Sequence, residues 1–281
     1  MALSTTKAAP QAPMLTIIGF PGVGKSTLAA LFPNPIFIQA ESATTVFEKW
    51  DVKDQPDFFA QLPSANAKRN VRPTEILMGQ LRELMTQEHD RKTVIIDTIT
   101  SLNMLIEQEI IAFNSDVVDN IGEACGGFGK GYLAVANKHA EIRTACEHLR
   151  KRGIAVVFLA HSGIVKTKNR PDAEAYTTWS IDMHEASRRV YIAQLDAVLY
   201  VKSKEHVLGS ESDKRGNIKK YGKLVSTGDR VIITASEGTI GYVDAKNRYD
   251  MPAEIELPEF ENPLLQYIPF FNTNAKEEVQ S

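Results

Sequence analysis

Short apolar runs alternate with segments whose apolar residues recur every three or four positions along the first 160 residues of the chain. The short runs predict buried strands, and the periodic segments predict amphipathic helices. Strands that alternate with helices favour an α/β fold, in which a mostly parallel sheet carries helices on both faces. The strands are predicted at residues 15–18, 35–40, 93–97 and 154–160, and the helices at 27–31, 74–85 (capped by Thr74), 102–113 and 132–153.

The pattern changes after Ser162, where a polar loop is predicted from Gly163 to about Glu185. Three further strands are predicted beyond this loop. The last two lie close together in the sequence, which favours antiparallel pairing at an edge of the sheet. They lie at residues 196–201, 230–235 and 239–243.

The chain divides into a flexible lead at residues 1–13, one core at residues 14–252 and a tail at residues 253–281. The tail holds a cluster of large apolar residues, which must dock either on the core of its own chain or on a neighbouring subunit. Residues 51–72 have no clear period and are expected to form a surface excursion. The stretch 122–131 is too rich in glycine to predict regular structure.

Composition narrows the possible partners and the compartment. The 281 residues are 43% hydrophobic, which is enough for a sizeable core, and the net charge of -3 excludes a uniformly basic nucleic-acid binder. The two cysteines, Cys125 and Cys146, lack the number for a disulfide framework and the spacing for a metal site, which fits a reducing cytoplasm. Neither a signal peptide nor a bilayer-crossing run is evident, so we expect a soluble protein without a membrane partner.

One motif is highly specific. Gly19, Gly24, Lys25 and Ser26 complete the spacing G-x-x-x-x-G-K-[ST] between a predicted strand and a predicted helix, as in a loop whose backbone N–H groups bind phosphate. A chance glycine-rich turn is the alternative, but strand, loop, lysine, hydroxyl and helix all fall in register. Lys25 is predicted to reach the β- and γ-phosphates and Ser26 to bind Mg²⁺, so ATP and Mg²⁺ are the expected cofactors. The predicted nucleotide-binding residues are Gly19, Pro21, Gly22, Val23, Gly24, Lys25, Ser26 and Thr27.

Three polar residues stand at the carboxyl ends of predicted strands, which is the edge of an α/β sheet where ligands gather. Asp97 is a candidate ligand of the Mg²⁺ ion, and Glu41 a candidate for orienting and deprotonating an attacking water. His161 is a candidate hydrogen-bonding sensor of the γ-phosphate. The alternatives are a simple cap for Asp97, a solvated acid for Glu41 and an ordinary core or loop histidine for His161.

The phosphate loop is followed along the chain by predicted strands that end at Glu41, Asp97 and His161. This order resembles the RecA-type recombinase core, and most closely the short phage-encoded RecA-like ATPases regarded as single-strand annealing or recombination proteins. The resemblance covers roughly Met14 to Pro252. It implies a RecA-like P-loop fold with catalytic Glu41, a metal-binding Asp97 and His161 in the place usually held by a glutamine sensor. It also implies that Lys246 and Arg248 reach across a subunit interface to the neighbour's nucleotide; taken alone, these two residues would be an ordinary charged turn.

The resemblance further implies a homo-oligomer with nucleotide at its subunit interfaces, single-stranded DNA as ligand, a single-strand-binding protein as a further partner, and the cytoplasm of a phage host as location. Ring and filament both stay open, because the residues before Met14 are too few for the N-terminal helix and polymerisation strand of full-length recombinases.

RecA-like cores hold DNA on two mobile loops, one before and one after the strand that ends at His161. Their basic residues neutralise phosphates and their aromatic rings stack on bases. The basic residues 214–223 either extend this track or form a solvated face. The predicted DNA contacts are Phe128, Lys130 and Tyr132 in the first loop, and Lys166, Lys168, Arg170, Tyr176 and Trp179 in the second.

The favoured function is an ATP-dependent recombination protein that binds single-stranded DNA, promotes annealing or strand pairing, and hydrolyses ATP with DNA stimulation. Two alternatives stay open. One is an accessory module that nucleotide switches without productive turnover, and the other is a motor like a hexameric helicase.

Overall fold

The computed structural model describes residues 10–42, 44–166, 177–209, 211–212, 218–220, 223–236 and 243–272. Ten strands form one sheet in the order β12-β10-β7-β1-β5-β4-β2-β3, with β11 paired to β7 and β6 paired to β5; β8 and β9 pair separately. The strands are β1 (Met14–Gly19), β2 (Pro35–Gln39), β3 (Asp57–Phe58), β4 (Thr93–Asp97), β5 (Ala155–Lys166), β6 (Thr177–Ile181), β7 (Ala197–Leu208), β8 (Glu211–Ser212), β9 (Ile218–Lys220), β10 (Lys223–Ile233), β11 (Lys246–Asn247) and β12 (Glu254–Glu256).

The predicted α/β fold class is confirmed, because the central strands β7, β1, β5, β4, β2 and β3 run parallel and β10 is antiparallel to β7. No helix in the described part of the chain is long and apolar enough to span a bilayer. The α-helices are α1 (Lys25–Ala30), α2 (Pro73–Thr86), α3 (Ile99–Ala112), α4 (Lys130–Lys151) and α5 (Glu185–Val190).

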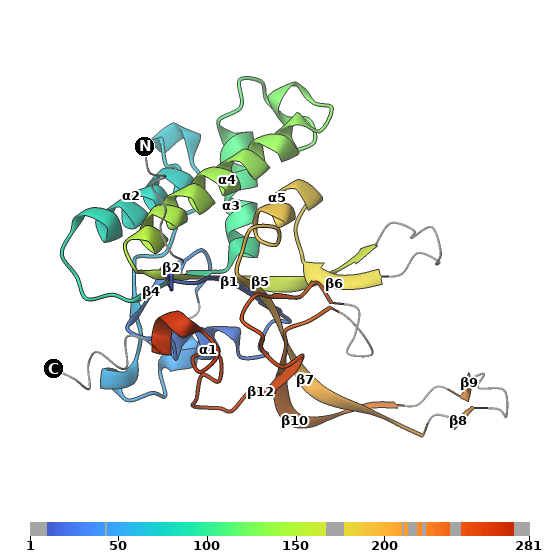
Figure 1. Ribbon diagram of the computed structural model, residues 1–281. Helices are drawn as coiled ribbons and strands as arrows, with labels where there is room; N and C mark the ends of the chain where they lie inside the picture. Colours follow the sequence, from blue (N-terminus) through green and yellow to red (C-terminus); the bar gives the residue numbers. More distant parts are fainter. Residues whose placement is uncertain are drawn as a thin grey trace, which may run out of the picture.

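Helices cover both faces of the sheet (Figure 1), with α2, α3, α4 and α5 on one face and α1 with the C-terminal segment on the other. Side chains of β1 alternate between the two layers, since Met14 and Ile18 pack under α2 to α4 whereas Leu15 and Ile17 pack against α1. Burial on both faces explains why these strands are continuous apolar runs in the sequence.

Two long hairpins flank β1, and both correct the sequence-based prediction. The loop predicted from Gly163 onward is wrong in part, because β5 continues to Lys166 and pairs antiparallel with β6. Likewise, β7 extends to Leu208 and pairs with β10, which in turn pairs with β12. Of the predicted strand at 239–243, residues 239–242 lie outside the described residues, and Val243 forms a bridge to Trp179 rather than to β10.

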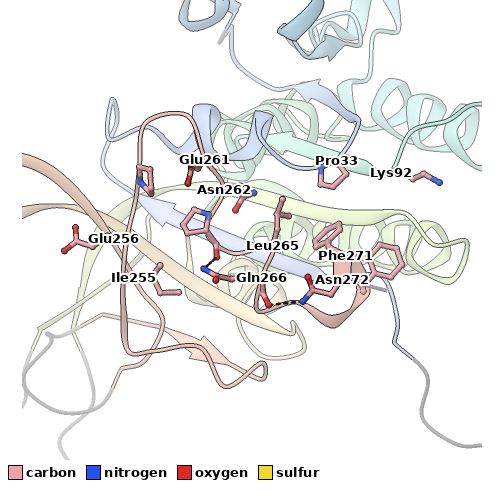
Figure 2. A pocket seen from close by; sticks show the side chains of 13 residues that line it. Pro33, Lys92, Ile255, Glu256, Glu261, Asn262, Leu265, Gln266, Phe271 and Asn272 are labelled. Atoms are coloured by element: carbon pink, nitrogen blue, oxygen red, sulfur yellow. Dashed lines mark hydrogen bonds between the residues drawn. The ribbon is translucent and has the colours of Figure 1, made fainter. Parts of the chain in front are cut away.

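The apolar tail docks on the core of its own chain. Leu264 and Ile268 are fully buried, and the ring of Phe271 lies 5.7 Å from that of Phe32, two residues after the end of α1. A cavity of about 840 Å³ remains between this segment and the residues Pro33, two positions before β2, and Lys92, one position before β4 (Figure 2). The cavity therefore lies at the amino ends of the parallel strands.

The start of α2 differs from the prediction that Thr74 caps this helix. Arg72 occupies the N-cap position without a side-chain cap, and Pro73 opens the helix. The Thr74 N–H and hydroxyl instead donate to the buried carboxylate of Glu109 on α3, at 2.9 and 2.6 Å. An acid from the neighbouring helix thus satisfies the first turn of α2.

A buried polar network joins α3, α4 and the turn after α5. The ring of His139 lies between the Tyr191 hydroxyl, 2.8 Å from Nδ1, and the Asn103 Oδ1 atom, 3.1 Å from Nε2. Because the amide oxygen only accepts, Nε2 of the imidazole carries a proton. Burial lowers the pKa of His139 from 6.5 to about 3.

This network predicts acid destabilisation. Since unfolded His139 takes up a proton near pH 6.5 and the folded protein resists it down to about pH 3, the free energy of unfolding falls as pH drops through that window. This one group contributes about 1.4 kcal/mol per pH unit to the slope of the free energy of unfolding against pH. In urea unfolding at pH 7, 6, 5 and 4, His139→Gln should lose this part of the slope, whereas His148→Gln, at an exposed position of the same helix, should keep it. Equal slopes for the wild type and His139→Gln would contradict the assignment.

Candidate functional site

The predicted phosphate loop connects β1 to α1, which begins at Lys25, two residues earlier than predicted. A Cβ atom on Gly19 would lie 2.6 Å from the Val201 carbonyl oxygen, so only glycine fits beside β7. Gly24 has a φ of 98°, in the left-handed region that favours glycine. The loop geometry therefore needs glycine at both glycine positions of the motif, Gly19 and Gly24.

Lys25 curls back over its own loop. Its ammonium group donates to the carbonyl oxygens of Gly19 and Phe20, at 3.0 and 2.9 Å, and lies 3.5 Å from Nδ1 of His161. Burial lowers the pKa of Lys25 to about 8, against the opposing effect of the Asp97 and Glu41 charges. The cation is therefore held ready at the loop that would receive the phosphates.

Ser26 and Asp97 form a corner suited to a divalent cation. The Ser26 hydroxyl donates to Oδ2 of Asp97 at 2.7 Å, while the buried Oδ1 atom has no hydrogen-bond partner among the described residues. Burial raises the pKa of Asp97 to about 6, although the hydrogen bond from Ser26 acts in the other direction. A buried carboxylate oxygen in need of a partner, beside a hydroxyl oxygen, fits Mg²⁺.

This metal would depend on ligands from the substrate. Within the described ranges, no group of three or more His, Cys, Asp and Glu residues could hold a metal ion. Magnesium commonly uses one or two protein oxygens and completes its shell with phosphate oxygens and water. The corner therefore fits a metal that arrives with nucleotide.

Glu41 meets His161 and Ser101 beside this corner. The Glu41 N–H bonds to the Asp97 carbonyl oxygen, which ties the end of β2 to the end of β4. The Ser101 hydroxyl donates to Oε2 of Glu41, and Nε2 of His161 lies 3.2 Å from Oε1. The hydrogen bond from His161 is the main cause that lowers the pKa of Glu41, so this carboxylate is ionised at neutral pH.

His161 is the link between the lysine and the acid. Strand β5 lies between β1 and β4 in the sheet, so its residue opposite Gly19 stands between the phosphate loop and Asp97. An ammonium group only donates and a carboxylate only accepts, so the contacts of His161 fit a neutral ring with its proton on Nε2. Its backbone N–H is fixed by the hydroxyl of Thr100 at 2.9 Å.

A protein-family model described as an AAA domain matches residues 11–249, which is most of the chain. The chain belongs to this AAA domain family. Together with the phosphate loop, membership makes the protein a P-loop ATPase and supports nucleotide hydrolysis, for which ATP and usually Mg²⁺ are needed. No curated protein sequence matches the chain. Among solved structures, a KaiC-like protein from the archaeon Pyrococcus horikoshii aligns with 89% of this chain and 91% of its own, at 14% identity and a TM-score of 0.41.

In this AAA-domain protein, Lys246 and Arg248 lie away from the phosphate loop. The ammonium group of Lys246 donates to the Ala193 carbonyl oxygen, before the start of β7. Arg248 is exposed and lies 3.8 Å from the carboxylate of Asp196, which accepts from the N–H of Met14. The phosphate loop leaves the opposite end of β1, about 17 Å further along the strand. Any contact of these two residues with nucleotide would therefore involve a neighbouring copy.

The glycine-rich segment before α4 is only partly irregular. A 3₁₀ helix spans Ala124–Gly126, and α4 begins at Lys130 rather than at Tyr132. Phe128 is fully exposed and Lys130 is exposed, whereas the ring of Tyr132 stacks on His184 with the centroids 4.4 Å apart. Two of the three predicted contact residues thus present free side chains, and the third is already packed.

The second predicted DNA-binding segment also needs correction. Lys168, Arg170 and Tyr176 lie outside the described residues, and Lys166 is the last residue of β5. Trp179 belongs to β6 rather than to an open loop, and it is half-buried. Its ring meets that of Phe20, in the phosphate loop, edge to face with the centroids 4.9 Å apart.

The contact between Phe20 and Trp179 predicts a fluorescence signal. Trp50→Phe leaves Trp179 as the only tryptophan, so its emission should change when Mg-ATP rearranges the phosphate loop. A second variant that adds Phe20→Leu should bind ATP but show a smaller change. Constant emission during ATP binding, with binding followed by calorimetry, would show that the two rings do not respond to nucleotide.

Sequence reasoning missed Ser101, Phe20 and Arg230 at this site. Ser101 lies in the first turn of α3, four residues after Asp97, where a small hydroxyl after a strand-end acid was the available signal. Phe20 lies within the motif, but at a position where the spacing accepts any residue. Arg230 of β10, whose guanidinium lies against Gly24 of the loop, gave no signal, because it is a single charged residue in a strand far along the sequence.

Proposed function

We propose that the protein is an ATP-dependent recombination protein, phage-encoded and acting in the host cytoplasm, that binds single-stranded DNA and promotes annealing or strand pairing. Its ATP site would be completed by Lys246 and Arg248 of a neighbouring copy in a ring or filament. The supporting observation is the position of His161, which contacts both Lys25 and Glu41 and lies on the strand that continues into the β5–β6 hairpin.

Hydrolysis follows from the geometry of the strand ends. Lys25 and the loop N–H groups bind the phosphates, and Ser26 with Asp97 would hold Mg²⁺, which supplies neutralisation of the phosphate charge. Glu41 orients a water and accepts its proton while the water oxygen bonds to the γ-phosphorus and ADP leaves with the electrons of the broken bond. His161 donates to Glu41, and a γ-phosphate oxygen that accepted the same Nε2 proton would free Glu41 to bind the water.

The hairpin after His161 is the element through which nucleotide would act on DNA. β5 runs without interruption from the buried core through His161 to Lys166, and Trp179 on the paired strand β6 touches the phosphate loop. The exposed Phe128 and Lys130 at the start of α4 would add a stacking ring and a phosphate-binding cation.

Phosphate release measured with and without single-stranded DNA, at about 50 and about 200 mM salt, tests this function. We expect DNA to stimulate turnover at low salt and the stimulation to fade at high salt. Phe128→Ala with Lys130→Ala should lose the stimulation and keep the basal rate, whereas Lys151→Ala, at the exposed far end of α4, should match the wild type.

Nucleotide binding without turnover, with or without DNA, would favour the nucleotide-switched accessory module instead. Both Glu41 oxygens have hydrogen-bond partners within the chain, an arrangement that such a module would share. DNA-independent turnover would retain the ATPase and remove the DNA-coupled role.

A further inference from the structure

Arg230 lies directly against the phosphate loop. A Cβ atom built on Gly24 would be 2.1 Å from Nη1 of Arg230 and 3.3 Å from its Cζ, so the guanidinium covers this glycine. Gly24 precedes Lys25, the residue that the motif assigns to the phosphates. A second cation therefore stands beside the loop, supplied by a strand some two hundred residues later in the chain.

The sheet register explains this placement. Arg230 is paired with Ser203 of β7, and Val201, two residues earlier, is paired with Gly19. Side chains two residues apart share a face, so Arg230 points to the same side as Ile232, which packs in the layer with α1. The phosphate loop passes over that face, and β10 delivers the arginine to it.

The charge surroundings of Arg230 suit an anion. The side chain is half-exposed, and no hydrogen bond or ion pair joins its guanidinium to another residue in the described part of the chain. Asp97 and Glu41 act on Lys25, whereas Arg230 approaches the loop from the side of Gly24. The planar guanidinium offers paired donors that match two phosphate oxygens.

We propose that Arg230 is a phosphate ligand of this site, which its own chain supplies from β10 and which binds the polyphosphate of a nucleoside di- or triphosphate. This inference rests on the proposed nucleotide binding. It differs from the predicted roles of Lys246 and Arg248, which need a neighbouring copy. Because the backbone of Arg230 also pairs with β7 and accepts from the Leu257 N–H, phosphate binding would fix the β7–β10 hairpin relative to the loop.

Calorimetric titration of the full chain with ATP, ADP and AMP in the presence of Mg²⁺ tests this assignment. We expect Arg230→Ala and Arg230→Gln to weaken ATP and ADP binding by about tenfold or more, since hydrogen bonds to charged groups are lost. AMP binding should change much less, because AMP lacks the β-phosphate. Arg230→Lys should restore part of the ATP affinity, and Lys223→Ala, an exposed cation on the same strand, should have wild-type affinity.

Unchanged or tighter ATP binding by Arg230→Ala would overturn the proposal, because the guanidinium would then contribute nothing to phosphate binding. Thermal unfolding of each variant separates a change in ATP affinity from a loss of fold. Arg230→Lys keeps the positive charge at this position. If the wild type binds ATP and Arg230→Ala binds it equally well, only the role of Arg230 fails. If the wild type binds no nucleotide, the proposed function fails as well.

Discussion

Glu41→Gln should bind Mg-ATP with near wild-type affinity and lose turnover by about 10² to 10⁴-fold. The amide keeps the size of the side chain, and its single oxygen at the Oε2 position can still accept from Ser101 while lying 3.4 Å from Nε2 of His161. It cannot accept a proton from water, so only the chemical step is affected. Phosphate release and equilibrium ATP binding, measured on the same preparation, give the two numbers.

The matched control for this variant is Glu48→Gln, which changes an exposed acid seven residues later and should leave turnover unchanged. Equal turnover in Glu41→Gln and the wild type would remove Glu41 from catalysis. A loss of ATP binding together with turnover would instead assign Glu41 to nucleotide binding.

Lys25→Ala should lower ATP affinity by about 100-fold or more, because its buried ammonium group is hydrogen-bonded within the phosphate loop, where it would meet the phosphates. The variant would also lose the contact between Lys25 and Nδ1 of His161, which joins the phosphate loop to β5. Binding of ATP measured by calorimetry gives the effect directly, and Lys49→Ala, at an exposed position, is the control.

The lysine variant also removes the donor to the Gly19 and Phe20 carbonyl oxygens, so its fold needs a separate check by thermal unfolding. A folded Lys25→Ala protein that binds ATP as tightly as the wild type would place the nucleotide somewhere other than this loop.

The sequence alone was enough to predict the phosphate loop and the three strand-end residues. The loop is a local motif with a fixed spacing, and its strand and helix follow at once in the chain. Glu41, Asp97 and His161 could be brought together because the carboxyl ends of parallel strands meet at one edge of a sheet. Their mutual contacts follow from strand order, which places β5 between β1 and β4.

The hairpins could not be predicted in the same way. Strand β5 continues beyond His161 and β7 beyond Val201, and both then carry many polar residues. The apolar run that predicts a strand therefore ends before the strand does. Their partners are fixed by pairing between distant segments, which local periodicity does not contain. The packing of Trp179 on Phe20 and the approach of Arg230 to Gly24 depend on this pairing.

The phosphate loop contacts a hairpin on each of its two sides, so nucleotide bound to the loop would act on both hairpins. On one side, Phe20 touches Trp179 of the β5–β6 hairpin, and on the other, Gly24 touches Arg230 of the β7–β10 hairpin. Both contacts come from the loop that is expected to bind the phosphates. We therefore expect the hairpins to respond to the same binding event.

Equilibrium binding of ATP to the purified protein, with and without Mg²⁺, is the most direct test of the nucleotide site. We expect saturable binding that Mg²⁺ strengthens, and Asp97→Asn should weaken this effect of the metal because Asp97 supplies the unpartnered buried oxygen. A folded wild-type protein with no affinity for adenine nucleotide in the presence of Mg²⁺ would contradict the site, its catalytic assignments and the DNA-coupled function built on them.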